Sequence, residues 1–366
     1  MGNKVLIAGA TGVVGHAALV YFSASPDWDV VAVSRRVPDC AAPFEHVAVD
    51  LTDEKACRDV FGRRSDITHV IYAALHDRVQ PDAEWPGTDS VSANLSMLRN
   101  LLEPLRKSST QLHHVTTLQG TKAYGVHVGQ QIPVPAKERW PRFEHKNFYW
   151  QQEDYIREAQ QSQSWHWTIF RPQIIFGYSI GSPMNHIPVI GVLAAICREE
   201  NLPMGFPGRS SSILEAIDAR LLARAFEWAA IADTSHNQIF NITNGDVFVW
   251  RNVWPTIANT LGTEAGPDNP LSVREFLQEH ESTWEDIVRK YKLRPLNLRD
   301  LIGQSGAHAD MGFRYGTNQS QSALVSTIKL RQSGFHACMD TEDAFQDWFR
   351  FYEQQRVLPP VLLDKG

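Results

Sequence analysis

Cysteine and clustered basic residues are scarce in this sequence of 366 residues. Its four cysteines stand far apart, and neither a CxxC pair nor an HExxH sequence occurs, which argues against a zinc site and a disulfide framework. Scattered free cysteines suit a reducing cytoplasm. The net charge of −6 and the lack of a Lys/Arg-rich block argue against a nucleic-acid partner.

Long hydrophobic runs are also missing. The longest, "IPVIGVLAAIC", is about half of a membrane span, so it predicts a buried helix and no membrane partner. A strand begins almost at the first residue, which leaves no room for a signal peptide. We therefore expect a soluble, cytoplasmic protein.

Short apolar runs alternate with helical stretches through the first half of the chain. This pattern predicts a parallel sheet of βαβ units, hence an α/β, Rossmann-type doubly wound fold. The expected strands are 4–8, 29–34, 68–74, 112–117, 167–172 and one within 237–246, and the expected helices are 13–25, 53–62, 90–107 and 147–162.

The chain changes character near residue 176. Gly, Pro and Ser become frequent, and beyond about residue 247 the sequence is helical and bears four tryptophans. We expect an NADP-binding Rossmann domain over 1–175, with a returning segment near 213–246. A smaller, mainly helical substrate-binding lobe is expected over 176–212 and 247–366.

The motif "GATGVVG" places Gly9, Gly12 and Gly15 between the first strand and the first helix. Small residues there let the backbone approach a pyrophosphate, and the helix N-terminus supplies N–H donors. A turn-and-packing motif is the plainer alternative, but the βαβ context favours dinucleotide binding. The GxxGxxG spacing resembles that of extended short-chain dehydrogenase/reductase proteins.

The second strand ends in Ser34, Arg35 and Arg36, where NAD-binding folds usually carry an acid. Two guanidinium groups favour a 2′-phosphate, so the sequence predicts NADPH/NADP+ rather than NAD. The alternative is a solvated loop. Asp50 and Leu51 resemble a pair that contacts adenine, although a helix N-cap explains Asp53 equally well.

Tyr149, in "NFYWQQED", is a candidate proton donor. A phenol needs a nearby cation to ionise near neutral pH. Most short-chain reductases supply a lysine four residues later, but this sequence has Glu153 there. Lys122, in the loop after the strand at 112–117, lies at the same carboxyl edge of the predicted sheet. A core tyrosine and an exposed lysine are the alternatives.

Six segments in this order resemble the progesterone 5β-reductase/iridoid synthase family: "GATGVVG", "SRR", "DLTD", "NFYWQQED", "FRPQIIFGYS" and "FNITNGDVFVW". The resemblance extends to "WEDIVRKYKL" near the C-terminus. It implies an NADPH-dependent ene-reductase that delivers hydride to the β-carbon of an α,β-unsaturated carbonyl compound. Tyr149 and Lys122 would stabilise the enolate, and the enzyme would be a homodimer acting on a small enone.

The resemblance also implies particular contacts. The expected cofactor-binding residues are Gly9, Thr11, Gly12, Val13, Gly15, Ser34, Arg35, Arg36, Asp50, Leu51, Ala73, Tyr149 and Ile175. The expected substrate-binding residues are Arg78, Phe148 and Met184, with core packing as the alternative for the last two.

The sequence departs from the family at "KAYGVH", at "AALHDR" and at Trp150, which replaces a second tyrosine. The first two segments line the substrate side in the family, so the substrate here can differ. Two other functions stay open: an extended short-chain dehydrogenase or epimerase acting on a carbonyl or nucleotide sugar, and an NADP(H)-binding redox sensor without turnover.

Overall fold

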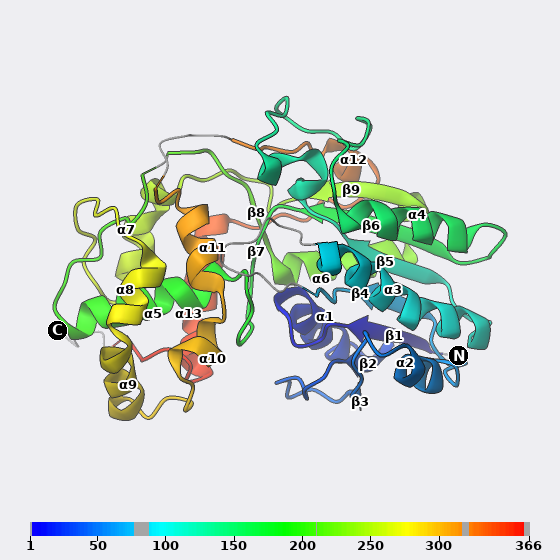
Figure 1. The fold of residues 1–366 in the computed structure, drawn as a ribbon, viewed down its shortest axis with the longest axis horizontal. Helices are drawn as coiled ribbons and strands as arrows, with labels where there is room; N and C mark the ends of the chain where they lie inside the picture. Colours follow the sequence, from blue (N-terminus) through cyan, green and yellow to red (C-terminus); the bar gives the residue numbers. More distant parts are fainter. Residues whose placement is uncertain (1, 77–87, 210, 317–321, 362–366) are drawn as a thin grey trace. The chain divides into compact units, whose positions relative to one another are not determined.

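The computed structural model describes residues 2–76, 88–209, 211–316 and 322–361. The chain forms two compact units (Figure 1). The first comprises residues 1–173, 219–243 and 325–337, and the second comprises 174–218, 244–324 and 338–366. Within the described ranges, no helix combines the length and apolar character that crossing a membrane requires.

A seven-stranded, wholly parallel sheet organises the first unit. The strand order is β3-β2-β1-β4-β5-β6-β9, which contains the Rossmann order 3-2-1-4-5-6 and confirms the predicted fold class. The strands are β1 (Asn3–Ala8), β2 (Trp28–Val33), β3 (Glu45–Val47), β4 (His69–Tyr72), β5 (His114–Leu118), β6 (His166–Pro172) and β9 (Gln238–Ile242).

Helices cover both faces of this sheet. Helices α1 and α6 pack together on one face, and α2, α3 and α4 pack in succession on the other. Their bounds are α1 (Val13–Ser23), α2 (Glu54–Phe61), α3 (Thr88–Ser108), α4 (Phe148–Gln160) and α6 (Ala219–Ile231). Because both faces are covered, the strands are apolar almost throughout, as the sequence indicated.

Several shorter helical elements also belong to the first unit: η1 (Thr121–Tyr124), η2 (Val126–Val128), η3 (Asp233–Ser235) and α12 (Ile328–Gln332). The last of these, α12, lies in a stretch that was expected to belong to the C-terminal lobe. It contacts β9, and Lys329 Nζ donates to the carbonyl oxygen of Ile239 at 2.9 Å. The segment 325–337 therefore packs with the Rossmann sheet, a long-range contact that no local pattern indicates.

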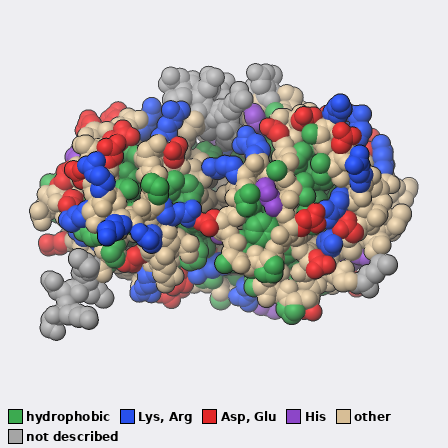
Figure 2. Space-filling view, turned by 90° about the horizontal axis from the view of Figure 1, so that it is seen from below, with side chains coloured by type: hydrophobic (Ala, Val, Ile, Leu, Met, Phe, Trp, Pro, Cys, Tyr) green, Lys and Arg blue, Asp and Glu red, His purple; other side chains and the backbone are tan. Residues whose placement is uncertain are grey.

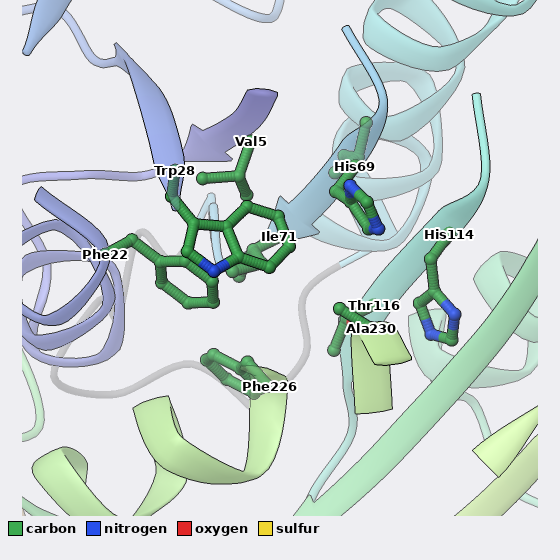
Figure 3. Close-up of a pocket in the computed structure, with 10 residues that line it drawn as sticks. Val5, Phe22, Trp28, His69, Ile71, His114, Thr116, Phe226 and Ala230 are labelled. Atoms are coloured by element: carbon green, nitrogen blue, oxygen red, sulfur yellow. The ribbon is translucent and has the colours of Figure 1, made fainter. Parts of the chain in front are cut away.

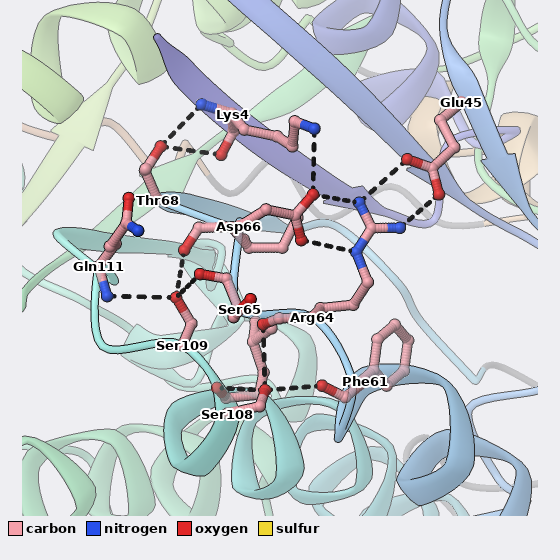
Figure 4. Close-up of polar contacts among 12 residues, drawn as sticks. Lys4, Glu45, Phe61, Arg64, Ser65, Asp66, Thr68, Ser108, Ser109 and Gln111 are labelled. Atoms are coloured by element: carbon pink, nitrogen blue, oxygen red, sulfur yellow. Dashed lines mark hydrogen bonds and ion pairs between the residues drawn. The ribbon is translucent and has the colours of Figure 1, made fainter. Parts of the chain in front are cut away.

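Ion pairs and hydrogen bonds connect the amino-terminal ends of several strands (Figure 4). Asp66, just before β4, accepts from Lys4 Nζ at 3.0 Å and from Arg64 Nε at 2.9 Å. Arg64 also binds Glu45 at the start of β3. The Ser109 hydroxyl, after α3, donates to the carbonyl of Ile67 at 2.7 Å. These contacts hold the amino-terminal ends of the strands, opposite the edge where the candidate site lies.

The second unit is mainly helical. A two-stranded parallel sheet, β7 (Ile174–Phe176) and β8 (Ala216–Asp218), packs with α5 (His186–Glu199), α7 (Trp250–Thr260), α8 (Val273–Glu279), α9 (Glu281–Lys290), α10 (Leu298–Ile302), α11 (Ser305–Gly312) and α13 (Thr341–Gln354). Helix α5 contains the longest apolar run, and every residue from His186 to Cys197 is buried, so the prediction of a buried helix is confirmed. The four tryptophans of this half, Trp250, Trp254, Trp284 and Trp348, are buried as well.

The surface carries charges of both signs. In Figure 2, basic and acidic side chains are interspersed over the face shown, with small apolar areas between them. The mixture of signs on this face agrees with the modest net charge of −6.

Candidate functional site

The glycine turn brings the exits of β1 and β4 into contact. Gly9 has φ +83°, and a Cβ there would lie 2.8 Å from the Ala73 backbone. A Cβ on Gly15 would lie 2.1 Å from the carbonyl oxygen of Gly9. Both positions therefore exclude any side chain for reasons internal to the fold.

Gly12 is different, because the fold alone does not require a glycine there. It is the N-cap of α1 in extended conformation (φ −83°), and a Cβ would make only an ordinary contact at 3.4 Å. Among the residues that the structure describes, no side chain caps the helix. Thr11 is half-buried beside it, and Val13 begins the helix and is buried. A helix start without a capping side chain, preceded by a residue that leaves room for close approach, fits the pyrophosphate of a dinucleotide.

The exit of β2 is built around Ser34. The buried Ser34 hydroxyl donates to the carbonyl of Arg36 at 2.6 Å and lies 3.3 Å from His46 Nε2 on β3. That nitrogen is also 3.2 Å from the Ser34 carbonyl oxygen. Arg35 and Arg36 are both exposed. The turn therefore fixes the backbone from which the two guanidinium groups project, and it leaves them accessible to a phosphate.

Asp50 and Leu51 follow β3. The Asp50 carboxylate accepts from the Thr52 N–H at 2.9 Å and from the Thr52 hydroxyl at 2.7 Å. These hydrogen bonds lower the pKa of Asp50 against the effect of burial, and the charges of Arg35 and His76 lower it further. Asp50 is thus within electrostatic reach of the β2 and β4 loops, where an adenosine would bind in this fold.

Local structure explains the neighbours of Asp50. Leu51 is buried in the core, and Asn100 Nδ2 donates to its carbonyl at 2.9 Å. Asp53 caps α2 by accepting from the Ala56 N–H at 2.9 Å, so the N-cap interpretation of Asp53 is confirmed.

The loop after β4 is fastened to α3 by Asn94, which is fully buried. Its Oδ1 accepts from the His76 N–H at 2.8 Å, and its Nδ2 donates to the His76 carbonyl at 2.9 Å. Gln152 of α4 in turn donates to the Asn94 carbonyl at 2.9 Å. The loop that begins at Ala73 is thereby held beside Gly9. Arg78, expected to contact substrate, lies outside the described residues.

Tyr149 and Lys122 belong to elements that meet. Asn147 caps α4 by accepting from the Tyr149 N–H at 2.9 Å, and its Nδ2 approaches the Lys122 carbonyl at 3.4 Å. A Cβ built on Gly120 would lie 3.4 Å from Tyr149 Oη. The phenol therefore points at the start of the loop that carries Lys122, although 27 positions separate the two residues in the sequence.

Glu153 does not take the place of a catalytic lysine. Its carboxylate is 3% exposed and is bound by Gln119 Nε2 at 2.8 Å, Arg142 Nη2 at 2.8 Å and Arg157 Nε at 3.0 Å. Burial raises its pKa, but the hydrogen bonds from Arg142 and Gln119 and the charges of Arg142 and Arg157 outweigh burial and leave the pKa below its ordinary value. Asp154 shares Arg142 at 2.6 Å. Both acids after Tyr149 are therefore parts of an arginine-rich network.

The other expected contact residues divide between the two units. Phe148 is 2% exposed and packs edge-on against the Tyr149 ring, with centroids 4.5 Å apart. Ile175 on β7 and Met184 before α5 are half-buried residues of the second unit. Asn185, beside Met184, is buried and donates to Gly177 O at 3.0 Å, so it holds the core of that unit.

Four residues of this region were not singled out from the sequence: His46, Gln119, Asn147 and Arg171. Asn147 and Arg171 stand inside the quoted segments "NFYWQQED" and "FRPQIIFGYS", so a search for N-caps and for buried charges within those motifs would have found them. His46 and Gln119 have no local signal, because their partners come from other elements: the exit of β2 for His46, and β6 and α4 for Gln119.

The strand order, the glycine turn and the loops that gather at the carboxyl edge define a Rossmann-type α/β fold. This fold matches solved extended short-chain epimerases. It aligns with the UDP-glucose 4-epimerase of Thermus thermophilus in complex with NAD at a TM-score of 0.62 and 19% identity, covering 95% of this chain and 99% of that one. A putative epimerase from Burkholderia cenocepacia gives a TM-score of 0.66 at 16% identity, covering 96% and 98%.

The chain belongs to the family of the PRISE-like Rossmann-fold domain, whose model matches residues 59–359. It is 32% identical to an (S)-8-oxocitronellyl enol synthase of Antirrhinum majus, over 94% of this chain and 89% of that protein. It is 31% identical to a 3-oxo-Delta(4,5)-steroid 5-beta-reductase of Arabidopsis thaliana, over 98% and 93%. The resemblance to the progesterone 5β-reductase/iridoid synthase family is thereby confirmed.

Proposed function

We propose that this protein is an NADPH-dependent reductase of the activated C=C bond of α,β-unsaturated carbonyl compounds. The observation that carries the proposal is the approach of Tyr149 Oη to the loop that contains Gly120 and Lys122. A Cβ built on Gly120 would lie 3.4 Å from this oxygen. Relatives named as a steroid 5-beta-reductase and as enol synthases support the same substrate class.

The cofactor would be held by the residues at the carboxyl edge of the sheet. Gly12 and the first turn of α1 would bind the pyrophosphate, and the exposed Arg35 and Arg36 would pair with a 2′-phosphate. Asp50 and the Ala73 loop would border the adenosine. When bound, the reduced nicotinamide supplies the hydride.

Tyr149 and Lys122 would act on the substrate carbonyl. As hydride reaches the β-carbon, the electrons of the C=C bond move toward the α-carbon and the carbonyl oxygen, which becomes an enolate. The Tyr149 hydroxyl donates a hydrogen bond to that oxygen, and the Lys122 ammonium stabilises the developing negative charge. Proton uptake at the α-carbon from water completes the saturated product. Loss of one such donor typically costs about 100- to 1,000-fold in kcat.

The identity of residue 153 favours this chemistry over that of an epimerase. An extended short-chain epimerase would be expected to use a lysine four residues after the tyrosine, whereas Glu153 is committed to arginines. A redox sensor without turnover would need neither Tyr149 nor Lys122.

Direct assay tests the proposal. Purified protein is mixed with NADPH and a cyclic enone, a linear enal or a 4-ene-3-oxo steroid. Loss of absorbance at about 340 nm and a product heavier by two hydrogens are expected. Tyr149→Phe should bind NADPH normally and turn over about 10- to 1,000-fold more slowly. A parental rate for this variant would place the tyrosine in the core and refute the mechanism.

The proposal extends to the state of the protein. We propose a cytoplasmic homodimer that acts on a small molecule. Light scattering coupled to size-exclusion chromatography measures the mass directly, and a value near the 41.3 kDa of one chain would contradict the dimer.

A further inference from the structure

A buried arginine fastens both ends of the loop that carries Lys122. Arg171, on β6, is 4% exposed. Its Nε donates to Gln119 Oε1 at 2.7 Å, and its Nη1 donates to the Tyr124 hydroxyl at 3.2 Å. Gln119 directly precedes Gly120, and Tyr124 ends the turn η1 that contains Lys122. One guanidinium therefore spans the segment from its first residue to its last.

The start of the loop is also tied to the helix of Tyr149. Gln119 Nε2 donates to Glu153 Oε2 at 2.8 Å and lies 3.5 Å from the Tyr149 carbonyl oxygen. The amide of Gln119 thus lies between a cation and an anion. Since a guanidinium only donates and a carboxylate only accepts, the Oε1 must face Arg171 and the Nε2 must face Glu153. The orientation of Gln119 is dictated by its two charged neighbours.

The far end of the loop is fixed in a similar way. The Tyr124 hydroxyl donates to Asn241 Oδ1 at 2.7 Å, and its ring lies 5.1 Å from the Arg171 guanidinium carbon. Asn241, on β9, is buried and donates to the carbonyl of Ala136 at 3.1 Å. Within the loop, the Ala123 N–H bonds to Gly120 O at 2.8 Å and the Gly125 N–H to Lys122 O at 3.1 Å.

Glu153 places a negative charge beside three arginines of this cluster. Arg171 Nη2 lies 3.9 Å from Glu153 Oε2, and the same carboxylate binds Arg142 and Arg157. A buried charge whose partner is removed is strongly destabilising, whereas a complete network holds one geometry. Glu153 therefore provides the counter-ion that allows a buried arginine to stand behind the loop.

From this arrangement we infer that Gln119, Arg171 and Glu153 are positioning residues that set the Lys122 loop against Tyr149. The inference rests on the proposed function, and it gives a role to the acid that stands where related reductases carry a lysine. In this chain the lysine, Lys122, lies in the loop after β5. Glu153, at the helix position that carries a lysine in related reductases, holds that loop in place.

The orientation of the Gln119 amide suggests a test in which the amide and the carboxylate are exchanged between positions 119 and 153. Gln119→Glu keeps the acceptor that faces Arg171 but sets a second carboxylate against Glu153. Glu153→Gln combined with Gln119→Glu restores a donor opposite an acceptor, because the amide of residue 153 then donates to the carboxylate at 119. Gln163→Glu, at an exposed position after α4, is the matched control.

Two measurements are made on each variant of the full chain. Steady-state kinetics with an enone give kcat and KM, together with the Kd for NADPH from its fluorescence. Hydrogen exchange reports the Ala123 and Gly125 amides. For Gln119→Glu we expect kcat to fall about 10- to 100-fold, the Kd for NADPH to stay within about threefold, and the two amides to exchange about tenfold faster. The double variant should return all three quantities to within about threefold of the wild type.

The inference is overturned if Gln119→Glu behaves like Gln163→Glu, or if the double variant is no better than Gln119→Glu. If Gln119→Glu does not fold, Tyr124→Phe removes only the hydroxyl at the other end of the loop. We then expect at least a fivefold lower kcat and faster exchange at Gly125, and unchanged values overturn the inference.

Failure of the proposed function is separable from failure of this inference. If the wild-type protein reduces no enone, the proposed function falls, and the exchange rates of Ala123 and Gly125 alone decide whether the network anchors the loop. If the wild-type protein is active and Gln119→Glu changes neither the exchange rates nor kcat, only the positioning role is refuted.

Discussion

Acid should destabilise the first unit through buried histidines at the amino-terminal edge of its sheet. His114 on β5 is 2% exposed and His69 on β4 is 6% exposed, and both line a small cavity with Trp28 and Phe226 (Figure 3). Neither ring nitrogen of His114 has a hydrogen-bond partner among the residues that the structure describes. A protonated imidazole at this position would therefore be buried without compensation.

Burial lowers the pKa of His114 to about 3, with further contributions from the nearby His69, His236 and His166. Burial, with the nearby His113, lowers the pKa of His69 to about 4. The unfolded chain keeps the ordinary value of 6.5 and so binds more protons below it. The contribution of the two neutral histidines to the free energy of unfolding is therefore fully present above pH 6.5. It decreases as the pH drops below 6.5, and for each histidine the decrease ends only near the pKa of the folded state.

The magnitude follows from this difference. At about pH 5 each unfolded imidazole has taken up nearly one proton, whereas the folded one has not. With about 1.4 kcal/mol per pKa unit, the loss from either histidine at that pH is about 2 kcal/mol. This is a large fraction of the stability of an ordinary domain, about 5–15 kcal/mol.

His114→Leu isolates one of these contributions. At about pH 8 we expect a change within about 1 kcal/mol, since apolar atoms replace two nitrogens that lack partners. Between about pH 8 and about pH 5 the variant should lose about 2 kcal/mol less than the wild type. Urea unfolding at both pH values measures the difference. His336→Leu, at an exposed site, is the control and should lose as much as the wild type.

An equal pH-dependent loss in His114→Leu and in the wild type would refute the reasoning. It would mean that His114 is already protonated in the folded protein, or that the cavity admits enough water to solvate its charge.

Three further predictions concern the cofactor site and its surroundings. Arg35→Ala should raise the KM for NADPH at least about tenfold with little change for NADH, and equal use of both cofactors by the wild type would contradict it. Gly12→Ala should leave the urea midpoint unchanged and weaken NADPH binding at least about tenfold. Gly15→Ala should instead destabilise the fold, because its Cβ would meet the Gly9 carbonyl. Fluorescence titration with NADPH and urea unfolding distinguish the two effects. Asp53→Ala should cost about 1 kcal/mol by removing the cap of α2, and a change below about 0.3 kcal/mol would show that the cap contributes nothing.

Much of the fold was predictable because its signals are local. The strand at 4–8 is an apolar run followed by Gly9, and only glycine tolerates the turn with φ +83°. The run in α5 was recognisable as a buried helix by its length and composition. Segment 325–337 was expected in the C-terminal lobe, whereas the structure places it beside β9 through a contact between residues that are 90 positions apart in the sequence.

The candidate site was predictable in part. Lys122 could be proposed as the partner of Tyr149 because loops after parallel strands gather at one edge of the sheet. The role of Glu153 could not be predicted, since a helical acid after an aromatic run is usually solvated. Its three arginines come from the segment before α4, from α4 itself and from β6.

Hydrophobic periodicity and the backbone conformations that glycine allows depend on neighbouring residues. The class of fold, the glycine turn and the residue types at the proposed cofactor site therefore follow from the amino-acid order alone. Which side chains meet depends instead on how distant segments pack. Gln119, Arg171 and Glu153 lie on a loop, a strand and a helix separated by up to 52 positions, and their hydrogen bonds exist only after β5, β6 and α4 have packed together. The burial that makes such a network costly to break is likewise a property of the assembled sheet and not of any one segment.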